Sequence, residues 1–102
     1  TGAVDEIVAK AVPDGYTYYL TGWRYIADMD CHFTLEVLDD TTLVEVIDLA
    51  MTNPQPGDFV VFPTPIRITG GTDRKIRVSA KRLRQGTPNS GSAAAGINGY
   101  MV

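Results

Sequence analysis

Apolar and polar residues alternate along most of this chain, which is the pattern of β-strands that bury one face. In 31–38, the odd-numbered positions from Cys31 to Val37 are apolar and the even-numbered positions between them are polar. In 75–83, positions 76, 78 and 80 are apolar and the residues between them are polar. We therefore predict that both segments are strands whose apolar positions point into a shared core.

Residues that favour turns separate these two segments from other strand-like ones. The predicted strands are 6–12, 16–27, 31–38, 43–50, 59–62, 66–69, 75–83 and 97–102. The predicted turns and loops are PDG (13–15), DMD (28–30), DDTT (39–42), TNPQPGD (52–58), PTP (63–65) and GGTDR (70–74), the last being a hairpin loop. In 43–50 apolar residues occupy both alternating sets, so the inward face of that strand stays open.

The number of strands predicts the fold class. Seven or eight short strands with regularly spaced turns indicate an all-β fold, an antiparallel β-sandwich or jelly roll. Only 3–11, which contains the helix-favouring residues Ala, Glu and Lys, offers a helical alternative. The 102 residues form one domain, 1–102, in which the small and polar segment 84–96 is expected to be a flexible loop or arm.

The segment YTYYLTGWRYIA (16–27) concentrates aromatic residues, but Arg24 falls among the apolar positions of one face of a straight strand. A β-bulge at Gly22 changes the phase, so that Leu20 points inward before it and Trp23 points inward after it. With this bulge Arg24 stays outside the core.

Two interpretations of the aromatic residues remain open. In the first, they fill the sandwich and their OH and NH groups reach its rim. In the second, Tyr19, Trp23 and Tyr25 form an exposed platform that stacks on sugar rings or inserts into another subunit.

Composition and charge add a second pattern. Hydrophobic residues make up 44% of the chain and charged residues 21%, as in an ordinary soluble globular protein. The net charge of −3 hides a gradient, because 1–60 carries eleven acidic and two basic residues, whereas 61–102 carries seven basic and one acidic. Pairing of acidic with basic strands across one sheet explains the gradient. The alternative is a polarised surface that docks head-to-tail or onto a charged partner.

The residues that carry most catalytic chemistry are scarce. Cys31 is the only cysteine and His32 the only histidine, and neighbours on a strand point to opposite faces, so they cannot form a nucleophile pair. The same count excludes a zinc site built from His and Cys within one chain and an intrachain disulfide, and no GxSxG or P-loop motif occurs. The acidic turns 28–30 and 39–40 are typical of plain turns rather than calcium sites. We predict a protein that is not an enzyme and has no cofactor.

Nucleic acid and membrane are not expected as partners. The basic run 74–84 lacks the stacking aromatic residues of nucleic-acid sites, so we expect a subunit interface or a solvated strand face there. No apolar run approaches the ~20 residues of a membrane span, and no basic-then-apolar leader opens the chain, which predicts synthesis and retention in a cytoplasm until assembly. The candidate interface residues are Tyr19, Trp23, Tyr25, Arg74, Lys75, Arg77, Lys81, Arg82 and Arg84.

The stretches PDGYTYYLTGW (13–23) and PIRITGGTDRKIRV (65–78) resemble small all-β structural proteins of tailed bacteriophages. In that group a turn of the P-x-G-x-x-Y-x-L type leads into the first long strand, and a Gly-Gly hairpin precedes a charged strand. The chain is most similar in kind to the jelly-roll decoration, or cement, proteins of phage heads, over roughly residues 12–80.

The resemblance implies a homotrimer clamped on the capsid surface where major capsid subunits meet. It also implies a virion location after synthesis in the host cytoplasm. Tail-fibre and receptor- or carbohydrate-binding β-sandwich modules look similar and provide the alternative function. No functional residue of these families transfers by motif, so the candidate interface residues rest on the physical arguments alone.

Overall fold

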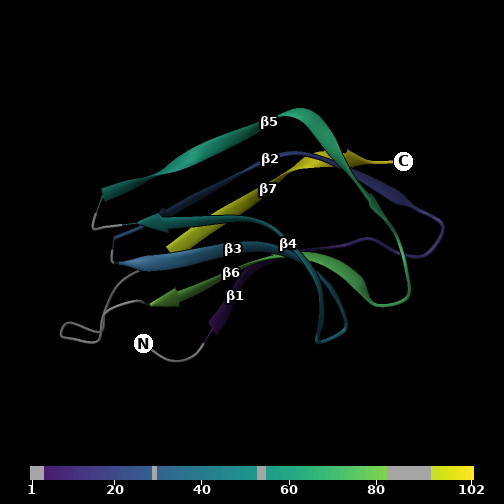
Figure 1. Cartoon of the computed structure of the whole chain (residues 1–102), viewed down its shortest axis with the longest axis horizontal. Coiled ribbons are helices and arrows are strands. Elements are labelled where there is room, and N and C mark those ends of the chain that lie inside the picture. The colour runs from purple at the N-terminus through teal and green to yellow at the C-terminus, as the bar shows by residue number, and fades with distance from the viewer. Residues whose placement is uncertain (1–3, 29, 53–54, 83–92) are drawn as a thin grey trace.

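Segments that contain β-branched and aromatic residues form most of the strands, as their composition favours, whereas β7 begins with three alanines and a glycine. The computed structural model describes residues 4–28, 30–52, 55–82 and 93–102, and these residues contain strands but no helix. The seven strands are β1 (Val4–Ala11), β2 (Thr17–Ala27), β3 (Cys31–Asp39), β4 (Thr42–Thr52), β5 (Gln55–Thr69), β6 (Arg74–Arg82) and β7 (Ala93–Met101) (Figure 1). The helical alternative for the first segment is therefore wrong over 4–11, where β1 pairs with β6.

The strands form two antiparallel sheets packed as a sandwich (Figure 1). Sheet A has the order β1-β6-β3-β4 and sheet B has the order β5-β2-β7. The predicted β-sandwich is confirmed. The jelly-roll form of it stays a prediction, because a full jelly roll has eight strands and the described residues form seven.

Only the β3–β4 connection joins neighbouring strands of one sheet, and every other connection between consecutive strands passes from one sheet to the other. The predicted hairpin at GGTDR is therefore wrong, since β5 and β6 belong to different sheets. The segment does turn the chain, and Arg74 N donates to Gly71 O. A local turn signal reverses the chain direction but does not determine which strands become neighbours.

Three predicted loops are wholly or partly strand. The predicted loop PTP (63–65) lies within β5, so the predicted strands 59–62 and 66–69 are parts of one strand. Residues 55–58 of the predicted loop 52–58 belong to β5, while 53–54 lie outside the described residues. Proline is tolerated there because β5 is an edge strand of sheet B. Of the predicted flexible segment 84–96, residues 93–96 form the start of β7, and the remainder lies outside the described part of the chain.

The core lies between the two sheets and follows the predicted alternation. Its fully buried members include Phe33 and Leu35 on β3 and Ile76 and Val78 on β6. All the odd-numbered positions of β3 predicted to point inward are buried, as are positions 76, 78 and 80 of β6. The inward faces of β3 and β6 are therefore those that the sequence indicates.

The bulge predicted at Gly22 is confirmed. On β7, Gly99 faces Leu20 and the next residue, Asn98, faces Gly22, so β2 carries one extra residue at this point. The side chains of Leu20 and Trp23 are both fully buried, on either side of the phase change. A Cβ on Gly22 would lie 2.2 Å from the backbone oxygen of Val60, so only glycine allows β5 to approach this closely.

Candidate functional site

The bulge places two of the three predicted platform residues inside the sandwich. Trp23 is 0% exposed, and its Nε1 donates a 2.9 Å hydrogen bond to Asp48 Oδ2 on β4. The ring of Tyr25 is half-buried and packs between Trp23 and Phe33, with ring centroids 4.9 and 5.3 Å away. The exposed platform is thus incompatible with this fold, and the first interpretation describes Trp23 and Tyr25.

Tyr19 lies on the other side of β2, because it precedes the bulge. Its ring stacks on that of Tyr100 of β7, with centroids 5.3 Å apart. Tyr19 is half-buried and Tyr100 is 53% exposed, so this pair belongs to the outer surface of sheet B.

Acidic partners engage the basic residues predicted for an interface. Arg74 binds Asp39 through two hydrogen bonds, Nε to Oδ1 at 2.8 Å and a terminal nitrogen to Oδ2 at 3.0 Å. Lys75 Nζ lies 2.8 Å from Glu6 Oε1. Pairing of acidic and basic strands across one sheet therefore accounts for at least part of the charge gradient.

The third pair is the most buried. Glu36 points to the outer face of sheet A yet is only 6% exposed, and its Oε1 accepts hydrogen bonds from Arg77 Nε at 2.8 Å and Ser79 Oγ at 3.1 Å. Of the other predicted residues, Lys81 is exposed on the outer face, while the side chain of Arg82 and the whole of Arg84 lie outside the described structure.

The outer face of sheet B carries a group of aromatic, aliphatic and arginine side chains that we call the aromatic–arginine face. It consists of Tyr19, Arg24, Ile26, Phe59, Val61, Arg67 and Tyr100. The strand register builds it in rows, since Arg24 stands between Phe59 of β5 and Gly96 of β7, and Tyr19 stands between Arg67 and Tyr100. Within the described residues, neither Arg24 nor Arg67 forms an ion pair.

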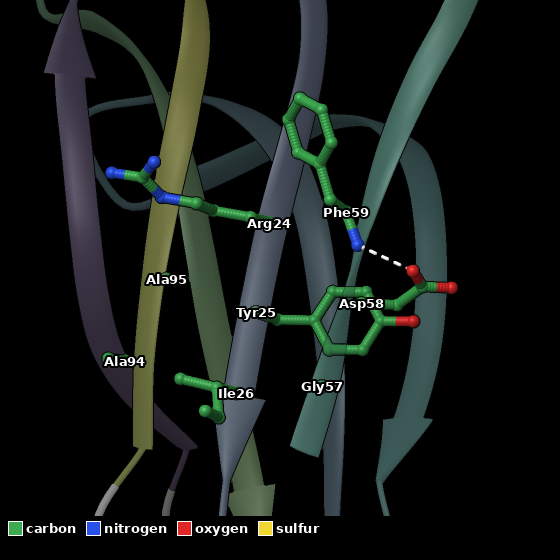
Figure 2. A pocket seen from close by; sticks show the side chains of 8 residues that line it. All are labelled: Arg24, Tyr25, Ile26, Gly57, Asp58, Phe59, Ala94 and Ala95. Atoms are coloured by element: carbon green, nitrogen blue, oxygen red, sulfur yellow. Dashed lines mark hydrogen bonds between the residues drawn. The ribbon is translucent and has the colours of Figure 1, made fainter.

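A hollow of about 550 Å³ opens on this face between the three strands of sheet B. Figure 2 shows the Arg24 side chain extending across β7, with Ile26 below it and the ring of Phe59 on the β5 side. Gly96 makes this arrangement possible, because a Cβ there would lie 2.6 Å from Arg24 Nε. The hollow therefore combines a guanidinium, an exposed ring and a floor of small residues.

The far end of the hollow has a different character. Asp58 lies there, and its Oδ1 accepts a 2.7 Å hydrogen bond from Phe59 N (Figure 2). Burial raises the pKa of the Tyr25 hydroxyl, and the charges of Asp58 and Asp48 add to that effect. Tyr25 and Asp58 face each other across β2 and β5, so their side chains lie on the opposite side of sheet B from those of Arg24 and Phe59, and the Arg24 guanidinium favours an anionic group on the outer side.

A second uncovered surface follows the edge strand β4. Five large side chains on it, each between 45% and 68% exposed, form what we call the β4 strip: Leu43, Val44, Val46, Leu49 and Met51. Bulges at Val44 and Ile47 shift the register with β3, so apolar residues from both alternating sets reach the surface. These bulges are why the inward face of this segment could not be chosen from the sequence.

The four edge strands differ in the features that prevent a strand of another molecule from pairing with them. β1 carries the charged residues Asp5, Glu6 and Lys10, and β5 carries three prolines, both of which oppose pairing with another strand. β7 lies against β1. The bulges of β4 oppose strand addition at its edge, but its aliphatic side chains remain uncovered, so β4 is suited to side-chain docking.

Residues considered for catalysis or metal binding do not come together. Cys31 is buried and His32 is half-buried on the opposite side of β3, as the alternation predicts. Asp40 sits in the β3–β4 turn with a φ of 58°, a conformation common for Asp in turns. Among the described residues, no group of three His, Cys, Asp or Glu side chains is arranged to hold a metal ion.

In the comparisons with known proteins, no family model, no curated protein and no solved structure matched this chain. In the part of the chain that the structure describes, no helix is long and apolar enough to cross a membrane.

The surfaces that the sequence reasoning missed left partial signals. Arg24 is the only basic residue between positions 11 and 66, and an isolated charge among aromatic residues suggests an outward position with no local partner. Phe59 and Arg67 gave no signal, because their place beside β2 depends on a crossing between sheets that the sequence does not reveal.

Proposed function

We propose that this chain is a non-enzymatic structural protein of a bacteriophage particle, a capsid decoration protein that acts by attachment. The observation that carries the proposal is that exposed apolar side chains are grouped rather than scattered. Nine of the large exposed ones belong to the β4 strip or the aromatic–arginine face. Contiguous apolar patches beyond a few hundred Å² mark interaction sites in soluble proteins.

The energy available from the β4 strip supports attachment through several copies. Full burial of a large aliphatic side chain contributes about 1.5–3 kcal/mol, so five that are half-exposed contribute roughly 4–7 kcal/mol. Association itself costs about 4–15 kcal/mol, so one such contact is weak. A homotrimer on major capsid subunits makes several contacts at once, which multiply through effective concentration, and binding only the assembled shell then stabilises it.

Ion pairs within the chain limit which of its basic residues can contact a partner. Arg74, Lys75 and Arg77 are engaged by carboxylates of the same chain, so breaking those pairs would oppose their use in an interface. Lys81 on the same strand is exposed and available to a partner. In this proposal the uncovered apolar surfaces supply affinity, and the exposed cations give register.

The test is to add the purified chain to phage heads that lack it and to measure retention and resistance to heat. Val46→Asp places a charge in the β4 strip, whereas Val4→Asp places the same charge at a similarly exposed valine on β1. We expect the wild type and Val4→Asp to bind and to raise the disruption temperature, and Val46→Asp to lose both effects. Heads that neither bind the wild-type chain nor gain heat resistance would reject the proposal.

One observation favours a second candidate, a receptor- or carbohydrate-binding module. The hollow beside Arg24 offers a ring, that of Phe59, on which a sugar can stack, and a guanidinium that can bind an acidic group. Titration calorimetry with neutral and acidic oligosaccharides tests this candidate. Trp23 fluorescence is a poor reporter because its indole is fully buried. The absence of heat with every glycan, together with head binding, would leave the decoration protein as the function.

A further inference from the structure

The aromatic–arginine face carries cations that have no acidic partner in the chain. The strand register places Arg24 and Arg67 on the outer side of sheet B, and no described residue on that side carries a carboxylate. Neither guanidinium forms an ion pair within the described residues. By contrast, carboxylates of the same chain engage Arg74, Lys75 and Arg77. The face therefore attracts a negatively charged group from another molecule.

The Arg24 side chain is held in position by the strand that it crosses. It extends over β7 at Gly96, where a Cβ would lie only 2.6 Å from its Nε and 3.2 Å from its Cζ (Figure 2). This close contact restricts rotation of the side chain. An anion that binds Arg24 therefore has less conformational entropy to remove than one that binds a freely rotating arginine.

The other residues of the hollow limit the kind of anion that it can accept. Ile26, Phe59 and Ala94 line it on the outer side of sheet B, and among the described lining residues on that side Arg24 supplies the only polar side chain. A guanidinium only donates hydrogen bonds. A sugar brings hydroxyl donors for which these side chains offer no acceptor, whereas a carboxylate accepts two parallel hydrogen bonds from a guanidinium. The hollow therefore favours a carboxylate with apolar neighbours over a sugar.

We propose that the aromatic–arginine face binds a segment of a partner protein in which a Glu or Asp side chain has apolar neighbours. The carboxylate binds the Arg24 guanidinium, and the apolar neighbours cover Phe59 and Ile26. This inference rests on the proposed function, in which the partner is the major capsid protein. It adds the surface on which that protein is bound and the chemistry of the segment that is recognised.

The apolar area of the face suits a protein segment. Its four large apolar side chains are 51–64% exposed: Ile26, Phe59, Val61 and Tyr100. With about 150–200 Å² for such a side chain when fully exposed, they offer roughly 350–450 Å². That is about half of the ~800 Å² that each partner buries in a standard protein interface. One such contact is weak by itself, which agrees with attachment through several copies.

The first experiment measures retention of the chain on phage heads that lack it, at increasing salt concentration. Arg24→Glu reverses the charge in the hollow, and we expect it to weaken binding at least tenfold. Arg24→Gln removes the charge, so its binding should depend less on salt than that of the wild type. Lys10→Glu is the matched control, because it reverses an exposed charge on β1, outside both the β4 strip and the face. Circular dichroism and thermal melting establish that each variant is folded.

A zero-length cross-link identifies the group that residue 24 contacts. Arg24→Lys places an amine in the hollow, and a carbodiimide joins an amine to a carboxylate in contact with it as an amide, taking up the water that is released. On heads that carry this variant, mass spectrometry should find position 24 joined to a Glu or Asp of the major capsid protein that has apolar neighbours. The wild type has no amine at this position and should lack the link.

The results that would overturn this inference differ from those that would reject the proposed function. Wild-type binding to heads that Arg24→Glu leaves unchanged would overturn the inference alone. Heads that never bind the wild type would reject the function, and the inference with it. A link from position 24 to a second copy of this chain would overturn the inference in favour of self-association, and binding of glucuronate oligosaccharides through Arg24 would overturn it in favour of the carbohydrate module.

Discussion

Gly22 is the residue on which the arrangement of β2 depends most directly. The bulge around it lets Leu20 and Trp23 both point into the core, and it requires the backbone of β5 to approach β2 closely. In Gly22→Ala the new Cβ would lie 2.2 Å from the Val60 carbonyl oxygen, where ordinary contact begins near 3.4 Å. Since the obstacle is backbone rather than a flexible side chain, the two strands must separate by about 1 Å.

Overpacking of this kind costs about 1–3 kcal/mol, and a backbone obstacle places Gly22→Ala near the upper end of that range. The chain has a total stability of about 5–15 kcal/mol by its length. For a domain of this size each kcal/mol lowers Tm by about 4–8 °C, so we expect a decrease of about 10–20 °C. Thermal and urea unfolding followed by circular dichroism measure it.

Gly71→Ala is the matched control. A Cβ at Gly71 meets nothing nearer than 3.7 Å, so that variant should unfold within about 1 kcal/mol of the wild type. The emission of Trp23 gives a second readout, because slipping of β2 would move a fully buried indole toward water. If Gly22→Ala melts with the wild type and keeps its emission maximum, the role assigned to the bulge is incorrect.

Three other predictions follow from the polar contacts. Asp48→Ala should destabilise the fold by about 1–3 kcal/mol, because it removes the acceptor of the Trp23 indole NH. Asp48→Asn keeps an acceptor and should destabilise the fold less. Urea unfolding measures the free energy of unfolding of both variants. The hydrogen bond from Arg74 lowers the pKa of Asp39, so the stability from this pair is present above pH 4 and is lost as pH falls below it. Asp39→Asn should therefore lose less stability on acidification than the wild type. An equal loss of unfolding free energy at low pH in the two proteins would contradict the assignment. Burial raises the pKa of Tyr25 above its ordinary value of 10.0, so its contribution to stability is intact below pH 10 and is lost as pH rises beyond it. Burial also raises the pKa of Tyr18, so Tyr25→Phe should reduce the amplitude of the late phenolate absorbance change without abolishing it, and an unchanged amplitude would contradict the attribution.

The parts of the fold that the sequence predicts are those set by local pattern. Alternation in β3 and β6 identifies their buried faces, and the conflict between Arg24 and its aromatic neighbours indicates the bulge at Gly22. In each case one face of the strand is buried in the core, so the apolar residues follow the two-residue repeat of the strand.

The parts that could not be predicted depend on contacts between distant segments. GGTDR turns the chain, but its flanking strands join different sheets. The partners of Arg74 and Arg77 are 35 and 41 residues away in the chain, so their engagement follows only from the order of strands in sheet A. The aromatic–arginine face has the same origin, since β5 and β7 reach β2 through crossings between sheets.

The proposed attachment is tested most directly by a cryo-electron microscopy map of the phage particle that contains this chain. We predict that the chain lies on the outside of the shell, with the β4 strip and the aromatic–arginine face covered by protein. A map that places the chain elsewhere, or that shows Val46 and Phe59 open to solvent in every copy, would contradict attachment through these surfaces.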